Sequence, residues 1–194
     1  MKLFTPLYDR ALAWSRHPHA PRYLALLSFA EASFFPVPPD VMLMPMALSQ
    51  PQKALRLALI ATVASALGGL LGYAIGYGLW DVLQPWLQSL GYGERLAQVQ
   101  HFFDVYGVWI VFAAGFSPIP YKLFTLTAGA MHMALLPFFI ASVVGRGARF
   151  LLVALLMRWG GERHAERIRA SVEGLGWAFV ILLLGWLFWR WQSG

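Results

Sequence analysis

The sequence predicts an all-α integral membrane protein, in which a re-entrant helical hairpin followed by a transmembrane helix occurs twice as an inverted repeat. Three observations support this class: a very apolar composition, long segments with few charges, and two apolar segments interrupted by prolines. The 194 residues are 59% hydrophobic and only 12% charged, and the mean hydropathy is +0.58. A soluble domain carries about 25% charged residues. We therefore exclude a soluble enzyme domain, a disordered chain and a nucleic-acid-binding module.

The first segment, residues 1–22, is predicted to form a helix that lies in the membrane interface. Its apolar side chains recur at helical spacing and face away from charged ones such as Lys2 and Arg10. The segment has no apolar core before its first charges and no small-residue cleavage site. We therefore do not expect it to be a signal peptide.

Two apolar segments, residues 23–50 and 105–131, are predicted to be re-entrant hairpins because prolines interrupt each of them. Proline removes a backbone hydrogen bond from a helix and clashes with the preceding turn. In lipid, such a break survives only where protein or a wet cavity surrounds it. The interrupting residues are Pro36, Pro38, Pro39 and Pro45 in the first segment, and Pro118 and Pro120 in the second.

A charge-poor segment follows each hairpin and has the length of about 20 residues that crosses a bilayer core. These segments are Leu57–Trp80 and Ala134–Met157, and a third, Gly174–Trp189, ends in tryptophans typical of membrane interfaces. The single membrane domain then divides, after the interfacial helix, into repeat one at 23–80, an amphipathic linker at 81–104, repeat two at 105–157, a cytoplasmic loop at 158–173 and a C-terminal transmembrane helix at 174–191.

The two hairpin units match each other in sequence, which predicts the repeat. Residues 36–41 (PVPPDV) match residues 118–123 (PIPYKL) in the pattern of prolines and apolar positions. Each unit makes one net crossing, so the copies are inverted, as in transporters that hold substrate where broken helices meet. We expect the two breaks to meet near the bilayer centre, with Asp40 and Lys122 close together or in one shared cavity.

The distribution of positive charge favours this topology. With re-entrant hairpins, ten cationic residues lie on the side of the N-terminus and two on the other side. If both hairpins crossed the membrane completely, the count would be nine against three. The excess of Lys and Arg marks the cytoplasmic side, so we expect a cytoplasmic N-terminus.

Five ionisable residues fall at predicted membrane depth. They are Glu31, Asp40, Lys122, Arg146 and Arg149. Each costs about 2.5–3.5 kcal/mol at the centre of a membrane helix, so the default expectation is an ion, proton or headgroup pathway. Three cations and two acids leave one surplus positive charge, which suits a lipid phosphate.

Structural roles stay open for the same residues. Asp40 could cap the helix that follows the first break. Lys122 could extend its ammonium group to the interface. Arg146 and Arg149 lie one helical turn apart and could be fixed partners of Glu31 and Asp40.

The order of these motifs resembles that of the DedA family of bacterial inner-membrane proteins, within the superfamily of SNARE-associated Golgi and VTT-domain proteins. Glu31 followed by Pro36–Asp40 is similar to the family's E-x(n)-P-x-P-acid signature. Phe116–Lys122, with Ala128-Gly129 after it, is similar to the family's F-x-P-G-x-R…A-G segment, in the form of the YqaA-like branch. The resemblance covers residues 10–190 and implies the re-entrant inverted repeat.

The resemblance also implies a function. Members of the family are associated with movement of undecaprenyl phosphate and phospholipids across the inner membrane, and with dependence on the proton-motive force. Glu31 and Asp40 would be the essential acids, and Lys122 would stand for the basic residue of the second hairpin. Lysine replaces the family's arginine, and Ile119-Pro120 replaces a glycine-containing turn, which leaves the lipid species open.

The leading hypothesis is therefore a flippase for a phosphate-bearing lipid. Lys122, Arg146 and Arg149 would bind the anionic headgroup, while Glu31 and Asp40 would take up protons or exchange partners with the cations during alternating access. The alternative is a proton-coupled exporter of small cations, with the two acids as its substrate site. We expect no enzyme, metal or cofactor, because no nucleophile–base pair, metal-ligand spacing or phosphate-binding glycine loop is present. Membrane lipids and protons are the expected partners, nucleic acid is not, and a homo-oligomer is compatible with the sequence.

Overall fold

The computed structural model describes residues 14, 15, 17–90, 93–117 and 119–160, and four single positions at 178, 181, 182 and 185. All regular secondary structure in this part of the chain is helical. The elements are α2 (Ala20–Ser33), α3 (Asp40–Ser49), the 3-10 helix η1 (Pro51–Lys53), α4 (Ala54–Ser89), α5 (Gly93–Phe116), α6 (Tyr121–Ala130) and α7 (Leu135–Gly160). The predicted interfacial helix at 1–22 and the predicted C-terminal helix at 174–191 fall largely outside the described residues.

The two helix breaks lie at the predicted prolines. Helix α2 ends at Ser33 and α3 begins at Asp40, and the segment between them contains Pro36, Pro38 and Pro39. Helix α5 ends at Phe116, and Pro120 directly precedes α6. Pro118 is outside the described residues. Pro45 was expected to contribute to the first break, but this expectation is wrong, because α3 continues through it.

Among the described residues, two helices are long and apolar enough to cross a membrane. The qualifying stretches are Pro51–Val82 and Leu135–Trp159, with mean hydropathies of 1.9 and 1.8. They contain the predicted spans Leu57–Trp80 and Ala134–Met157, apart from Ala134 itself. Helix α4 continues through Pro85 to Ser89, and α5 begins four residues later at Gly93. The segment 81–104 is therefore made mostly of the ends of two long helices.

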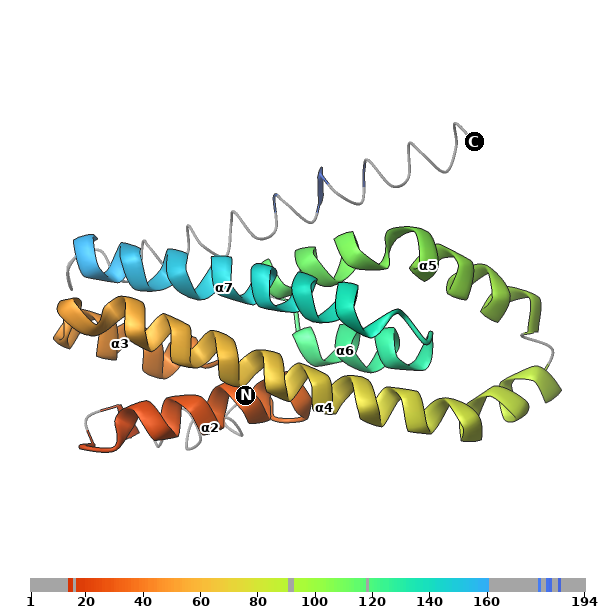
Figure 1. Ribbon diagram of the computed structural model, residues 1–194, viewed down its shortest axis with the longest axis horizontal. Helices are drawn as coiled ribbons and strands as arrows, with labels where there is room; N and C mark the ends of the chain where they lie inside the picture. Colours follow the sequence, from red (N-terminus) through yellow and green to blue (C-terminus); the bar gives the residue numbers. More distant parts are fainter. Residues whose placement is uncertain are drawn as a thin grey trace, which may run out of the picture.

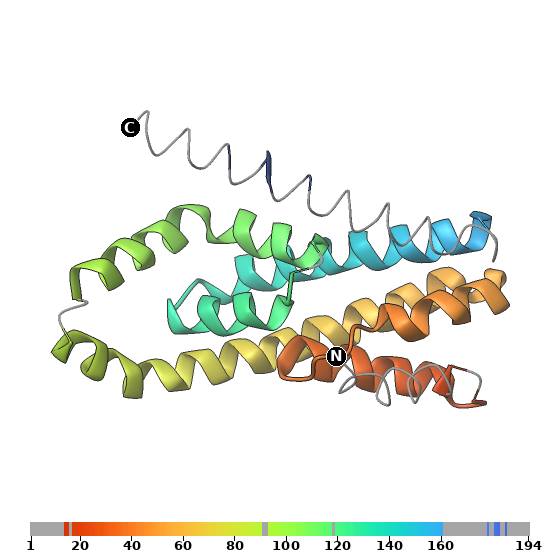
Figure 2. The ribbon, with the colours of Figure 1, turned by 180° about the vertical axis from the view of Figure 1, so that it is seen from behind.

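Helix α4 runs along the length of the molecule, and α2, α3, α6 and α7 pack against it (Figure 1), whereas α5 packs against α6 and α7. Helix α2 runs from one end of the bundle toward its middle, where the chain turns and α3 runs back. Helix α5 runs toward the middle from the opposite end, and α6 runs back. The view from behind shows the same arrangement, with both turns near the middle (Figure 2). Helix α7 packs against α3, α4 and α5. Both helix breaks therefore lie near the middle of the bundle's length, and Pro36, Pro38 and Pro120 are exposed at its surface.

Glycines on α4 allow this close packing. A Cβ on Gly68 would lie 2.2 Å from the carbonyl oxygen of Phe29 in α2, and a Cβ on Gly76 would lie 1.9 Å from that of Leu126 in α6. Gly129 in α6 is equally close to α4, because its Cβ would lie 2.0 Å from the carbonyl oxygen of Tyr73. These three glycines thus allow the helix backbones to come into contact, as small residues do in membrane bundles.

The apolar core consists of two clusters separated along α4 and α7. One cluster joins α2, α3, the start of α4 and the end of α7, where Phe150 and Val153 are buried. The other joins the middle of α4, α5, α6 and the start of α7, where Phe138 and Ala141 are buried. The stretch of α7 between the clusters carries Arg146 and Arg149, among other residues. The fold therefore places these arginines in a polar layer between two apolar ones.

Candidate functional site

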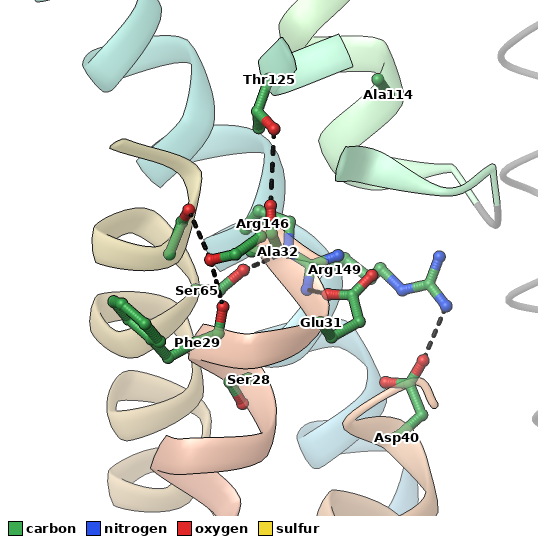
Figure 3. A network of polar contacts seen from close by, with 12 residues as sticks. Ser28, Phe29, Glu31, Ala32, Asp40, Ser65, Ala114, Thr125, Arg146 and Arg149 are labelled. Carbon is green, nitrogen blue, oxygen red and sulfur yellow. Dashed lines mark hydrogen bonds and ion pairs between the residues drawn. The ribbon is translucent and has the colours of Figure 1, made fainter. Parts of the chain in front are cut away.

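The polar layer is centred on Arg146, which is buried between helices α2 and α4 (Figure 3). Its Nη2 donates to Oε2 of Glu31 in a salt bridge, and its Nε donates to the hydroxyl of Ser65 at 2.7 Å. The side chains of Arg146 and Glu31 are 4% and 12% exposed, so both charges are largely removed from solvent. A buried charge of this kind needs such a partner, because its desolvation costs several kcal/mol (order of magnitude).

Aromatic rings complete the surroundings of Arg146. Its guanidinium carbon lies 5.1 Å from the ring centroid of Tyr121 and 4.7 Å from that of Phe150, within the range of cation–π attraction. Tyr121 is fully buried, and its hydroxyl forms a hydrogen bond with Ser142 on α7. Arg146 is thereby fixed by an acid, a hydroxyl and two rings.

Arg149, one turn later on α7, joins the two helix breaks. Its Nη2 donates to Oδ2 of Asp40 at 2.7 Å, and its Nη1 donates to the carbonyl oxygen of Ser117 (Figure 3 shows the Asp40 contact). Asp40 is the first residue after one break, and Ser117 is the first after the helix that leads into the other. Within the described part of the chain, the second oxygen of Asp40, Oδ1, is buried and accepts no hydrogen bond.

Lys122 makes a weaker contact across the same region. Its Nζ donates to the carbonyl oxygen of Phe34 at 3.4 Å; Phe34 is the C-cap residue that directly follows α2. Thr125, one turn later on α6, contacts the carbonyl oxygen of Ala32 at 3.4 Å (Figure 3). The last carbonyls of a helix lack intrahelical partners and carry partial negative charge, so they attract a cation. Among the described residues, Lys122 has no carboxylate within salt-bridge distance.

These contacts bear on the structural roles that the sequence left open. The pairing of both arginines with the two acids, which the sequence left open, is confirmed. Asp40 does not cap α3, because it is the first helical residue and the preceding Pro39 occupies the cap position without a side-chain hydrogen bond. Asp40 and Lys122 were expected to lie close together or in one shared cavity; the direct partner of Asp40 is Arg149, and Lys122 contacts the end of α2.

Several members of the site were not predicted. Ser65 and Tyr121 have no charge, and only the occurrence of a hydroxyl in an apolar segment could have indicated them. The carbonyls of Phe34 and Ser117 are backbone groups, so no residue type reveals them. The availability of these carbonyls as hydrogen-bond acceptors does follow from the breaks, because each interrupted helix leaves its last carbonyls without partners within the helix. The described residues contain no group of three or more His, Asp or Glu side chains that could hold a metal ion.

Comparison with known proteins adds two groups of relatives. The chain is 50% identical to an uncharacterized protein of Haemophilus influenzae over 182 residues, which cover 94% of this chain and 95% of that protein. It is 46% identical to an uncharacterized protein of Histophilus somni over 184 residues, or 95% and 96% of the two chains. Undecaprenyl phosphate transporter A of Staphylococcus aureus is 32% identical over 99 residues, or 47% of this chain and 48% of that one.

No solved structure matches the chain significantly. The sequence profile of the VTT domain matches residues 37–159, which include Asp40, Lys122 and both arginines of the polar layer. The match begins after Glu31, so the assignment of Glu31 to the site depends on its contact with Arg146 and not on the profile. Since the profile covers well over half of the chain, the protein belongs to the VTT-domain family, the DedA family of membrane proteins.

Proposed function

We propose that this protein moves a phosphate-bearing lipid across the bacterial inner membrane. The single observation that carries the proposal is the environment of Lys122, a cation at a helix break whose hydrogen-bond partner, among the described residues, is a backbone carbonyl and not a carboxylate. The two other cations of the polar layer each hold a carboxylate. The layer therefore has one surplus positive charge, available to an anion. The relative in Staphylococcus aureus, named as a transporter of undecaprenyl phosphate, supports the same kind of substrate.

The proposed topology follows the directions of the helices. The α2–α3 and α5–α6 pairs would be re-entrant hairpins that enter from opposite sides, as two inverted copies of one unit. Helices α4 and α7 would be the membrane-crossing members of these copies. The positive charge near the N-terminus supports a cytoplasmic location for that end. In this arrangement Lys122 reaches the substrate near mid-membrane, where the lipid tail can stay in the bilayer while the headgroup crosses.

Glu31 and Asp40 are the proposed proton-exchanging groups. Each is held by an arginine, so protonation of the carboxylate would weaken that salt bridge. At Asp40 this would free Arg149, whereas at Glu31 the contacts with Ser65 and two aromatic rings would still hold Arg146. Export of small cations, the alternative function, would instead require these two acids to bind the substrate. Both are already occupied by arginine side chains, so lipid-phosphate transport is the better-supported function.

Reconstitution into proteoliposomes tests this function. A fluorescent phosphate-bearing lipid should move between leaflets faster with the purified protein than in empty vesicles. Lys122→Ala should reduce the rate on the order of tenfold, because a charged hydrogen bond to phosphate would be lost, and Lys122→Arg should retain it. Lys53→Ala removes an exposed cation on η1 and serves as the matched control. Equal rates for the folded Lys122→Ala variant and the wild type would contradict the proposal, as would competition by cationic drugs alone.

A further inference from the structure

We propose that the two arginines of the polar layer have different roles. Arg149 exchanges its partner Asp40 for a phosphate group, which it binds together with Lys122. Arg146 and Glu31 form a fixed link that holds the bundle and does not bind substrate. This inference rests on the proposed function, and it identifies the phosphate-binding residues of that site and the carboxylate that competes with the phosphate.

The contacts of Arg146 make it a fixed residue. Its guanidinium group is bonded through Nε and Nη2 to Ser65 and Glu31, and the rings of Tyr121 and Phe150 lie beside it. These four partners come from α4, α2, α6 and α7, so movement of Arg146 would disturb four helices at once. A phosphate that replaced Glu31 would have to displace its carboxylate, which is 12% exposed, beside the fully buried rings of Tyr121 and Phe150. Arg146 is therefore poorly placed to exchange partners.

The contacts of Arg149 are of another kind. Both of its partners, Asp40 and the carbonyl of Ser117, lie at helix breaks, and no aromatic contact to it is recorded among the described residues. Its side chain is 11% exposed, compared with 4% for Arg146. Asp40 uses one carboxylate oxygen, and the other is buried without a hydrogen bond in the described part of the chain. A carboxylate left half-satisfied in this way gives up part of its possible stabilisation.

Arg149 and Lys122 act on the same segment of chain. Lys122 contacts Phe34 at the start of the first break, and Arg149 contacts Asp40 at its end. Arg149 also contacts Ser117, and Lys122 follows the second break. A phosphate that replaced Asp40 would meet the planar fork of Arg149, which matches phosphate oxygens, and the ammonium group of Lys122. The site would then hold two cations for one dianionic group.

Competition between Asp40 and phosphate for Arg149 predicts how the affinity for phosphate changes in a variant. If Asp40 occupies Arg149 for most of the time, phosphate binds only to the minor unpaired state. Asp40→Asn weakens this competitor with nearly the same side-chain shape. The apparent affinity should rise by roughly tenfold if the unpaired state is about one-tenth populated in the wild type. Glu31→Gln should not tighten binding, because Arg146 does not take part.

The experiment measures binding of dodecyl phosphate to the full chain in detergent, with inorganic phosphate and dodecanol as parallel probes. We expect Asp40→Asn to bind dodecyl phosphate more tightly than the wild type, and Arg149→Lys to bind it on the order of tenfold more weakly, because lysine lacks the bidentate fork. Inorganic phosphate should show the same order of variants if the headgroup alone is recognised. Dodecanol should bind all variants equally.

Ser65→Ala provides a second variant on the fixed link if Glu31→Gln does not fold. Tighter binding by Glu31→Gln or Ser65→Ala than by Asp40→Asn would overturn the assignment, and so would unchanged affinity in both Asp40→Asn and Arg149→Lys. The same experiments distinguish a failure of the proposed function from a failure of this inference. If the variants follow the expected order but the wild type moves no lipid in proteoliposomes, the phosphate site stands and transport does not. If the wild type moves lipid but Asp40→Asn does not tighten binding, the exchange is wrong and transport stands.

Discussion

Replacement of Gly76 by alanine tests the packing that positions the site. Gly76 is buried on α4, against the backbone of α6, the helix that begins with Tyr121 and Lys122. A Cβ at this position would lie 1.9 Å from the carbonyl oxygen of Leu126, whereas contacts of real Cβ atoms are essentially never under 3.0 Å. The difference of 1.1 Å must be supplied by separation of α4 and α6, because a backbone carbonyl cannot rotate away as a side chain can.

The size of the effect follows from this separation. Overpacking of a tight interface costs about 1–3 kcal/mol, and the rigid backbone contact places Gly76→Ala near the upper end. Alanine recovers up to about 1 kcal/mol through its better helix propensity. We therefore expect a net loss of about 2 kcal/mol in the free energy of unfolding, which corresponds to a decrease in Tm of roughly 4–8 °C for a chain of this size. Fluorescence of the nine tryptophans, followed on heating in detergent, gives the measurement.

Gly78, two residues later on the same helix, provides the matched control. It is exposed, and a Cβ there would have nothing within 4 Å. Gly78→Ala should therefore keep or raise Tm, since only the gain in helix propensity remains. Equal Tm values for Gly76→Ala and Gly78→Ala would refute the close contact between α4 and α6.

Three further predictions concern the polar layer and the topology. Glu31→Gln leaves Arg146 buried without its carboxylate and should lower the free energy of unfolding by about 3–5 kcal/mol, measured by thermal or denaturant unfolding. Tyr121→Phe keeps the ring beside Arg146 and loses one hydroxyl contact, so the same measurement should show a loss of only about 1 kcal/mol. The chain has no cysteine, so single cysteines at Lys53 and Glu94 should react with a membrane-impermeant reagent from opposite sides of the membrane; labelling from one side would contradict the proposed topology.

The sequence allowed the breaks and the charged layer to be predicted, because both depend on residue type. Proline removes a backbone hydrogen bond from a helix, so a break at Pro36, Pro38 and Pro39 could be predicted without any tertiary information. Pro45 shows the limit of this rule, since α3 continues through it. Pro45 is the sixth residue of α3, and the loss of its backbone N–H does not end the helix there.

The partners within the charged layer could not be assigned from the sequence. Arg146 and Arg149 lie on one face of α7, so either could reach either acid by helical spacing alone. The packing of α2 against α4 decides the question, because it brings Glu31 to the level of Ser65 and Arg146. Lys122 was matched with Asp40 by their equivalent positions in the two units. It contacts the end of α2 instead, where free carbonyls offer a cation a favourable field.

The sequence distance between the ion-pair partners has a consequence for biosynthesis. Glu31 and Arg146 are 115 residues apart, and Asp40 and Arg149 are 109 apart. At synthesis rates of about 5–20 residues per second, the two acids wait roughly 5–20 s for their arginines to leave the ribosome. Under the proposed topology, the first hairpin would carry two unneutralised carboxylates during this interval, each costing about 2.5–3.5 kcal/mol at the centre of the membrane. The nascent chain would therefore keep this hairpin near water, or with a chaperone or insertion factor, until α7 is made.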